Sequence, residues 1–187
     1  MTKLLTTRLS LEPFRDEHLP GLHAMNADPE VMRYISGRAE TLEETAAMVE
    51  RVKLRWAEFG YSWWSFIERD SGELVGAGAI QNLRREATPL PDPACPLEIG
   101  WRLRRDRWQQ GLASEAARAM AGFAFDALHA NELLAVCDPD NAASAQVMKR
   151  LGMQGCGLET WYGKPLATYK IGAADWRAAQ GADEGGS

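Results

Sequence analysis

Histidine and cysteine are both scarce in this chain of 187 residues, which contains three of each. The cysteines, Cys95, Cys137 and Cys156, are odd in number and far apart, a pattern that indicates neither a disulfide framework nor a zinc site. No apolar run is long enough to cross a bilayer, and the first residues show no signal-peptide pattern. We therefore expect reduced thiols, no metal, no membrane partner and a cytoplasmic location.

The chain also has few positive charges. Its 21 Lys and Arg residues are outnumbered by 26 Asp and Glu residues, which gives a net charge of -5. A nucleic-acid-binding surface needs a basic face, so nucleic acid is not an expected partner, whereas acidic surroundings attract amines. The 45% of hydrophobic residues indicates a folded chain. We expect one domain over residues 1–180, monomeric or homodimeric, and a polar, disordered tail at 181–187.

The hydrophobic periodicity switches between strand and helix patterns, which predicts a mixed α/β (α+β) class. Thr41 and Glu44 form a capping box before a helix that Gly60 ends. The segment 82–96 holds four prolines and is expected to be an exposed loop on the substrate side. The expected strands lie at 5–11, 61–68, 74–81, 97–103, 132–137, 154–159 and 167–171, and the expected helices at 16–25, 30–35, 42–59, 111–130 and 142–151.

The segment after residue 103 contains the pattern that indicates a binding site. Gly111 and Ala113 stand where a strand has ended and a helix begins, so the small side chains let the backbone amides of residues 109–114 approach an anion. The helix dipole adds roughly half a positive charge at the same point. The frame fits neither a lysine-bearing P-loop nor a GxGxxG motif. From the residues alone, the segment is either an anion site at a helix start or simply a turn.

Three segments, in order and with matching spacing, resemble the GNAT superfamily of acetyltransferases, in the form of its RimJ/RimL-like branch. Residues 108–116 (WQQGLASEA) resemble the coenzyme A pyrophosphate loop, with Trp108 where most members have Arg or Gln. Residues 7–11 followed by 28–32 resemble the N-terminal signature of the branch. Residues 141–144 followed by 150–153 resemble its second coenzyme-contacting helix.

The resemblance implies a mixed, mostly antiparallel central sheet, flanked by helices and splayed to admit coenzyme A. It implies an acyltransferase that moves acetyl from acetyl-CoA to a primary amine, a protein N-terminus or a small amine, by direct attack in a ternary complex. A detoxifying small-molecule acetyltransferase and a non-catalytic acetyl-CoA sensor stay open as alternatives. The sequence does not identify the acceptor or the role of the 82–96 loop.

The same resemblance assigns the coenzyme contacts. Backbone groups of Trp101 and Leu103 would pair with the pantetheine arm, Asn141 would hydrogen-bond it, and Ser144 would lie near the sulfur. The pyrophosphate loop consists of Trp108, Gln109, Gln110, Gly111, Leu112, Ala113 and Ser114.

Two residues are candidates for proton transfer. Many family members carry a tyrosine four residues after the position of Ser144, where this chain has Met148, so Ser144 becomes the candidate acid for the leaving thiolate. Its alternative role is a helix-start serine that bonds the local backbone. Glu98 is the candidate base, or else a strand carboxylate paired with an arginine. Glu68 is a second candidate for the base.

Overall fold

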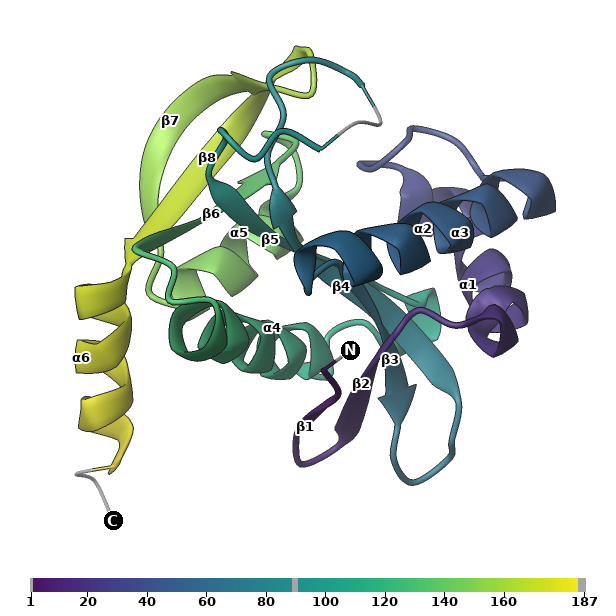
Figure 1. Cartoon of the computed structure of the whole chain (residues 1–187), viewed down its shortest axis with the longest axis horizontal. Coiled ribbons are helices and arrows are strands. Elements are labelled where there is room, and N and C mark those ends of the chain that lie inside the picture. The colour runs from purple at the N-terminus through teal and green to yellow at the C-terminus, as the bar shows by residue number, and fades with distance from the viewer. Residues whose placement is uncertain (1, 89–90, 185–187) are drawn as a thin grey trace. The chain divides into compact units, whose positions relative to one another are not determined.

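The computed structural model describes residues 2–88 and 91–184 (Figure 1). The fold is mixed α/β, with a central, mostly antiparallel sheet flanked by helices, which confirms the predicted class. The chain divides into two compact units, Met1–Ile80 with Gly100–Met120, and Gln81–Ile99 with Ala121–Ser187. The single domain expected over residues 1–180 stays a prediction.

The first unit holds the N-terminal half of the chain and the segment that carries the candidate loop. Its strands follow one another in the order β1-β2-β3-β4, and the pairs β1/β2, β2/β3 and β3/β4 are antiparallel. Its elements are β1 (Leu4–Leu5), β2 (Leu9–Pro13), η1 (Asp16–His18), α1 (Leu19–Asn26), α2 (Pro29–Met32), α3 (Leu42–Phe59), β3 (Trp63–Glu68), most of β4 (Leu74–Asn82), the end of β5 (Leu97–Leu103), η2 (Arg105–Arg107) and most of α4 (Leu112–Gly122).

The predicted capping signals are confirmed in α3. The Thr41 side chain accepts from the backbone N–H of Glu44, and the Glu44 carboxylate accepts from the N–H of Thr41, so two otherwise unpaired donors are satisfied. Gly60 ends the helix at φ 76, a left-handed conformation that costs a glycine little. The predicted hairpin is also present as β3 and β4. The single strand expected over 5–11 is instead the short pair β1 and β2.

The core of the first unit is built from aromatic and aliphatic side chains of β2, β3 and α3. Trp56 of α3 meets Trp64 of β3 edge to face, with ring centroids 4.8 Å apart. A buried cation lies on β5: Arg102 donates from Nε to the side-chain oxygen of Asn26 on α1 at 3.1 Å, and its guanidinium stacks over the Trp63 ring. These contacts tie β5, the strand that leads into the loop, to α1 and β3.

The second unit contains the C-terminal strands, in the order β5-β6-β8-β7. The pairs β6/β8 and β7/β8 are antiparallel along their lengths, whereas β5 and β6 are parallel with the register pair Glu98↔Leu134. The unit continues after α4 with the π-helical turn η3 (Phe123–Ala127), β6 (Glu132–Cys137), α5 (Ala142–Arg150), β7 (Gln154–Trp161), β8 (Lys164–Gly172) and α6 (Ala173–Glu184).

Two C-terminal features differ from the sequence expectation. The helix expected over 111–130 is α at its start and π over Phe123–Ala127, where the N–H of Leu128 donates to the oxygen of Phe123, five residues earlier. Helix α6 reaches Glu184, so it overlaps the tail expected at 181–187, of which residues 185–187 lie outside the described part. The Trp176 ring of α6 stacks on the Phe125 ring, with ring centroids 5.5 Å apart. This contact anchors the helix.

Candidate functional site

The loop before α4 has the backbone of an anion-binding nest. Gln109 has φ 60 and Gly111 has φ 78, while Gln110 between them does not have a positive φ. Alternating left- and right-handed residues turn successive backbone N–H groups toward one point, where they can surround an anion. A glutamine in the left-handed region is strained, and such strain gathers at functional sites. The 11-residue helix α4 begins at Leu112 and directs its dipole at the same point.

The Ser114 hydroxyl provides independent support for an anion at this loop. Its Oγ is shielded from solvent and has no hydrogen-bond partner within the part of the chain that the structure describes. A buried hydroxyl without a partner costs about 1–3 kcal/mol, so such groups are rare in native proteins. Ser114 lies in the first turn of α4, next to the nest. A phosphate oxygen bound there would accept a hydrogen bond from this hydroxyl.

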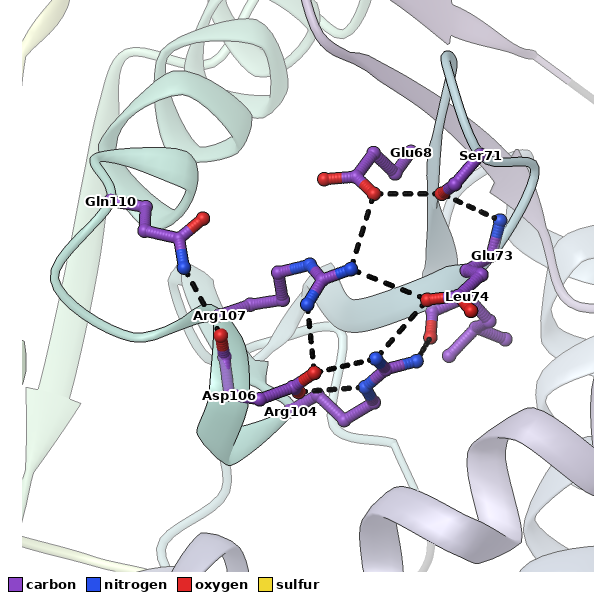
Figure 2. Close-up of polar contacts among 8 residues, drawn as sticks. All are labelled: Glu68, Ser71, Glu73, Leu74, Arg104, Asp106, Arg107 and Gln110. Atoms are coloured by element: carbon purple, nitrogen blue, oxygen red, sulfur yellow. Dashed lines mark hydrogen bonds and ion pairs between the residues drawn. The ribbon is translucent and has the colours of Figure 1, made fainter.

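The segment that enters the loop is fixed by a network of ion pairs with the β3–β4 turn (Figure 2). Arg104 holds Asp106 with two hydrogen bonds of 2.8 and 2.7 Å, and its Nη2 also pairs with Glu73 at 3.1 Å. Arg107 contacts the carboxylates of Asp106 and Glu68. The hydrogen bond from Arg104 lowers the pKa of Asp106 to about 2. Asp106 therefore stays ionised over the physiological range, and the network holds η2 against the hairpin.

This network also assigns a role to Glu68, the second candidate for the base. Its carboxylate accepts from Ser71 Oγ at 2.7 Å and from Arg107 Nη2 at 3.3 Å. The hydrogen bond from Ser71, together with Arg107, lowers the pKa of Glu68. A general base for an amine needs a pKa nearer to neutral, so Glu68 is better suited to binding Arg107 than to accepting a proton.

The main-chain groups of β5 alternate between the side of β4 and the opposite side. The N–H of Arg104 donates to the oxygen of Val75 on β4 at 2.8 Å. Main-chain groups of neighbouring residues in a strand point to opposite sides, so those of Leu103 and Trp101 are directed away from β4. The carbonyl of Leu103 accepts from the indole Nε1 of Trp108 at 2.9 Å. Trp108 thus ties the loop back to the strand through its side chain, a contact that the sequence did not reveal.

Helix α5 contains the residues expected near the sulfur and the pantetheine. Asn141 is the N-cap, and its Oδ1 accepts from the N–H of Ser144 at 3.1 Å, so part of its side chain serves the helix itself. The Ser144 hydroxyl, in contrast, makes no hydrogen bond within the described residues, so the alternative of local backbone bonding is not observed. Met148 is 2% exposed and has no acidic proton to donate.

Glu98 lies in a cluster of polar side chains within the second unit. The residue is 7% exposed, and its Oε1 accepts from Gln81 Nε2 at 2.7 Å and from the hydroxyl of Tyr162 at a short distance. Burial raises the pKa of Glu98, although both hydrogen bonds oppose this shift. No arginine forms a direct ion pair with Glu98 among the described residues, but the positive charge of Arg84 also opposes the rise in its pKa, so the expected pairing with an arginine is present as a longer-range attraction. A buried carboxyl with a raised pKa suits a general base.

Tyr162 is the residue of this cluster that sequence reasoning missed. It lies in the two-residue turn between β7 and β8, where Tyr162 and Gly163 both have positive φ, at 54 and 74. The left-handed region is unfavourable for an aromatic residue, and here it directs the hydroxyl to Glu98. The signal in the sequence was a bulky residue before glycine in a hairpin turn, a position that usually holds Asn or Gly.

The 82–96 segment is fastened to the same turn. The N–H of Tyr162 donates to the oxygen of Arg84 at 2.7 Å, and the N–H of Gly163 donates to the oxygen of Arg85 at 2.9 Å. The Arg85 guanidinium also lies 3.7 Å from the centre of the Trp161 ring. The expected exposed loop is therefore anchored at its start, with residues 89–90 outside the described part.

None of the helices in the described part of the chain has the length and apolar character that a membrane span requires. His, Cys, Asp and Glu side chains in residues 2–88 and 91–184 form no group of three that could hold a metal ion. The three cysteines are free.

A strand that leads into a loop of this kind at a helix start can bind the phosphate groups of a coenzyme. Comparison with known proteins identifies the family: residues 8–154 match the acetyltransferase (GNAT) domain, and the chain belongs to this family. Acetyl-CoA is the acetyl donor that the family uses.

Relatives and a solved structure agree with this assignment. YkkB of Bacillus subtilis, an uncharacterized protein, is 30% identical over 170 residues, which are 90% of this chain and 95% of that protein. An FsC-acetyl coenzyme A-N(2)-transacetylase of Aspergillus fumigatus is 32% identical over 86% of this chain and 68% of its own length. RimL, a ribosomal L7/L12 alpha-N-protein acetyltransferase solved with coenzyme A, shares the fold with a TM-score of 0.74 at 18% identity, covering 91% and 98% of the two chains.

Proposed function

We propose that this chain is an N-acetyltransferase that transfers the acetyl group of acetyl-CoA to a primary amine by direct attack in a ternary complex. The observation that carries the proposal is the nest at Gln109–Gly111 beside the solvent-shielded, unpartnered hydroxyl of Ser114. The name of the Aspergillus relative specifies a nitrogen, N(2), which supports a nitrogen acceptor here as well. The proposal includes a cytoplasmic location, where free thiols stay reduced.

The resemblance to the GNAT family suggests the coenzyme contacts, and the local geometry of each segment supports them. The amides of residues 109–114 and the Ser114 hydroxyl bind the pyrophosphate, since the nest and the helix dipole both favour negative charge there. The backbone groups of Trp101 and Leu103 that face away from β4 pair with the pantetheine arm. Asn141 retains its amide N–H₂ group as a donor to the pantetheine while its oxygen caps α5.

The chemical step needs a proton acceptor and a proton donor. The neutral amine attacks the thioester carbonyl, the nitrogen loses its proton, and the carbon–sulfur bond breaks to leave coenzyme A thiolate. Glu98 accepts the amine proton, directly or through water, because its raised pKa brings the carboxylate nearer to the basicity that this task needs. Ser144, whose hydroxyl is free of local bonds, or a water molecule donates a proton to the thiolate.

The acceptor is a protein N-terminus or a small amine, as in the RimJ/RimL-like branch. Thiol release from acetyl-CoA across a panel of amines and N-terminal peptides, with acetylated product confirmed by mass spectrometry, tests the reaction. We expect turnover with at least one acceptor. Tight acetyl-CoA binding with no turnover on any acceptor would instead indicate a non-catalytic sensor.

Replacing Ser114 with alanine is expected to weaken the binding of acetyl-CoA without lowering the stability of the fold. The change removes a buried hydroxyl that has no partner, so the unfolding temperature should stay the same or rise. The lost hydrogen bond to a charged phosphate is worth about 1.5–3 kcal/mol, which corresponds to a roughly tenfold or greater rise in the Kd of acetyl-CoA. Thermal unfolding and calorimetric titration measure the two effects. An unchanged Kd would show that this hydroxyl does not bind the coenzyme.

Replacing Ser144 with alanine is expected to slow turnover modestly, by about tenfold, without changing the Kd of acetyl-CoA. A thiolate is a good leaving group near neutral pH, since the reference pKa of a thiol is about 8.5, so an acid contributes little. Steady-state kinetics with saturating acetyl-CoA measure the change. Parental turnover would assign the protonation of the thiolate to water.

A further inference from the structure

The N-terminal segment around Arg8 reaches the coenzyme loop, although it lies about a hundred residues earlier in the chain. The Arg8 guanidinium donates from Nη1 to the backbone oxygen of Gln110 at 2.8 Å and from Nε to Glu115 Oε2 at 2.6 Å. The backbone N–H of Arg8 and the hydroxyl of Thr6 donate to the other oxygen, Glu115 Oε1, at 2.7 and 2.6 Å. Arg8 and Glu115 thus join the turn between β1 and β2 to residues on both sides of Gly111.

The charges in this contact matter because of where Glu115 lies. It is in the first turn of α4, close to the point where the pyrophosphate would bind, and a carboxylate there repels an anion. Burial raises the pKa of Glu115, but hydrogen bonds from Thr6 and Arg8 outweigh burial and lower it, so the group is ionised at neutral pH. Its charge therefore needs a counter-charge, and Arg8 is the cation in contact with it.

The second effect of Arg8 is on the backbone of the loop. Gln110 lies between the two left-handed residues, so a hydrogen bond to its carbonyl fixes the peptide unit that joins Gln110 to Gly111. Arg8 Nη2 lies 3.4 Å from the position that a Cβ on Gly111 would occupy, which puts the guanidinium directly against the nest. A preset loop avoids the entropy of ordering when the ligand binds.

We propose that Arg8 and Glu115 form a clamp that positions the pyrophosphate loop and cancels the carboxylate charge beside it. Arg8 is a positioning residue in this proposal, which rests on the coenzyme-binding function proposed above. This proposal gives the Thr7–Leu11 signature a physical reason, because the segment places the Arg8 guanidinium at the start of α4.

Arg69 offers a matched control. Its Nη1 donates to the backbone oxygens of Thr6 and Thr7, at 2.7 and 3.1 Å, so it supports the same N-terminal turn, and among the described residues it forms no hydrogen bond or ion pair with residues 110–115. Arg8→Gln and Arg69→Gln remove the same charge from neighbouring sites. A merely structural role for the turn predicts the same outcome for both variants, whereas the clamp predicts a change at the loop for Arg8→Gln alone.

Two measurements test the clamp. Without ligand, the ¹⁵N backbone order parameters of residues 110–114 should fall in Arg8→Gln and stay parental in Arg69→Gln, because the loop is then no longer held. The Kd and KM of acetyl-CoA should rise about tenfold in Arg8→Gln, with kcat and the KM of the amine within twofold of the parent. Adding Glu115→Gln to Arg8→Gln should recover part of the affinity, because the uncompensated carboxylate is then gone.

The outcomes separate the two proposals. If Arg8→Gln leaves both the order parameters of the loop and the coenzyme affinity at the parental level, or if Arg69→Gln changes them equally, the clamp is wrong. If the parent itself does not bind acetyl-CoA, the proposed function fails, while the order parameters of the loop amides still decide whether Arg8 and Glu115 hold the loop.

Discussion

Replacing Gly111 with aspartate is expected to raise the Kd of acetyl-CoA by about a hundredfold or more. Gly111 has φ 78, and an L-residue in that conformation costs about 1–2 kcal/mol, which shifts the loop away from the nest geometry. The new carboxylate adds negative charge beside the pyrophosphate. The Cβ of the new aspartate would also lie 3.4 Å from Arg8 Nη2. Its carboxylate would therefore compete with the Gln110 carbonyl and the Glu115 carboxylate for the Arg8 guanidinium. About 2.7 kcal/mol suffices for a hundredfold loss.

Gly37 provides the control for this variant. It has φ 76 in the same unit, and nothing lies within 4 Å of the position of its Cβ. Gly37→Asp therefore imposes the same backbone strain without charge at the loop, and we expect parental affinity for acetyl-CoA. The Kd of acetyl-CoA for Gly111→Ala should fall between the values for Gly111→Asp and Gly37→Asp. Calorimetry on the three variants gives the comparison, and equal affinity of Gly111→Asp and the parent would contradict the loop assignment.

Replacing Glu98 with glutamine is expected to lower kcat/KM for the amine by about a hundredfold near pH 7, at the low end of general-base effects. Glutamine keeps the size of the side chain and an oxygen for Tyr162 and Gln81, so the change removes basicity with little disturbance of packing. The deficit should shrink at high pH, where more of the acceptor is present as free amine. A pH profile of kcat/KM for both proteins measures this.

The same group links stability to pH in a defined direction. Because burial raises the folded pKa of Glu98 above its unfolded value, the folded state binds the proton more tightly. Stability should therefore fall as the pH rises from the unfolded pKa through the folded one, and Glu98→Gln should lack this fall. Glu132→Gln, an exposed carboxylate on β6, controls for loss of charge. If Glu98→Gln turns over like the parent at every pH, Glu98 is not the base.

The sequence predicted features that depend on neighbouring residues. Thr41, Glu44 and Gly60 set both ends of α3 through contacts within four residues, so local pattern was sufficient. The glycine at the strand-to-helix junction was likewise a local signal, and Gly111 has the positive φ that such a turn requires, while the role of the loop at 108–116 stays a prediction. The shortened strand at β2 and the π turn in η3 were not predicted, since both follow from packing rather than from local propensity.

The parts of the site that the sequence did not predict depend on contacts between distant residues. Tyr162 meets Glu98 across 64 positions, and Arg8 meets Glu115 across 107, separations that no periodicity encodes. The capping role of Asn141 was missed for a different reason: the motif suggested a ligand contact, and the local hydrogen bond to Ser144 also satisfies the residue. Ser114 became informative only once its hydroxyl was seen to be buried without a partner.

Titrating acetyl-CoA into ¹⁵N-labelled protein tests most directly whether the loop before α4 binds the pyrophosphate. Amides that donate to a phosphate move downfield as the anion binds, so the largest shifts should fall on residues 109–114, with coenzyme A giving the same pattern and the amine acceptor alone leaving it unchanged. Saturable binding whose shifts map elsewhere, with the amides of residues 109–114 unmoved, would contradict the assignment of this loop as the coenzyme site.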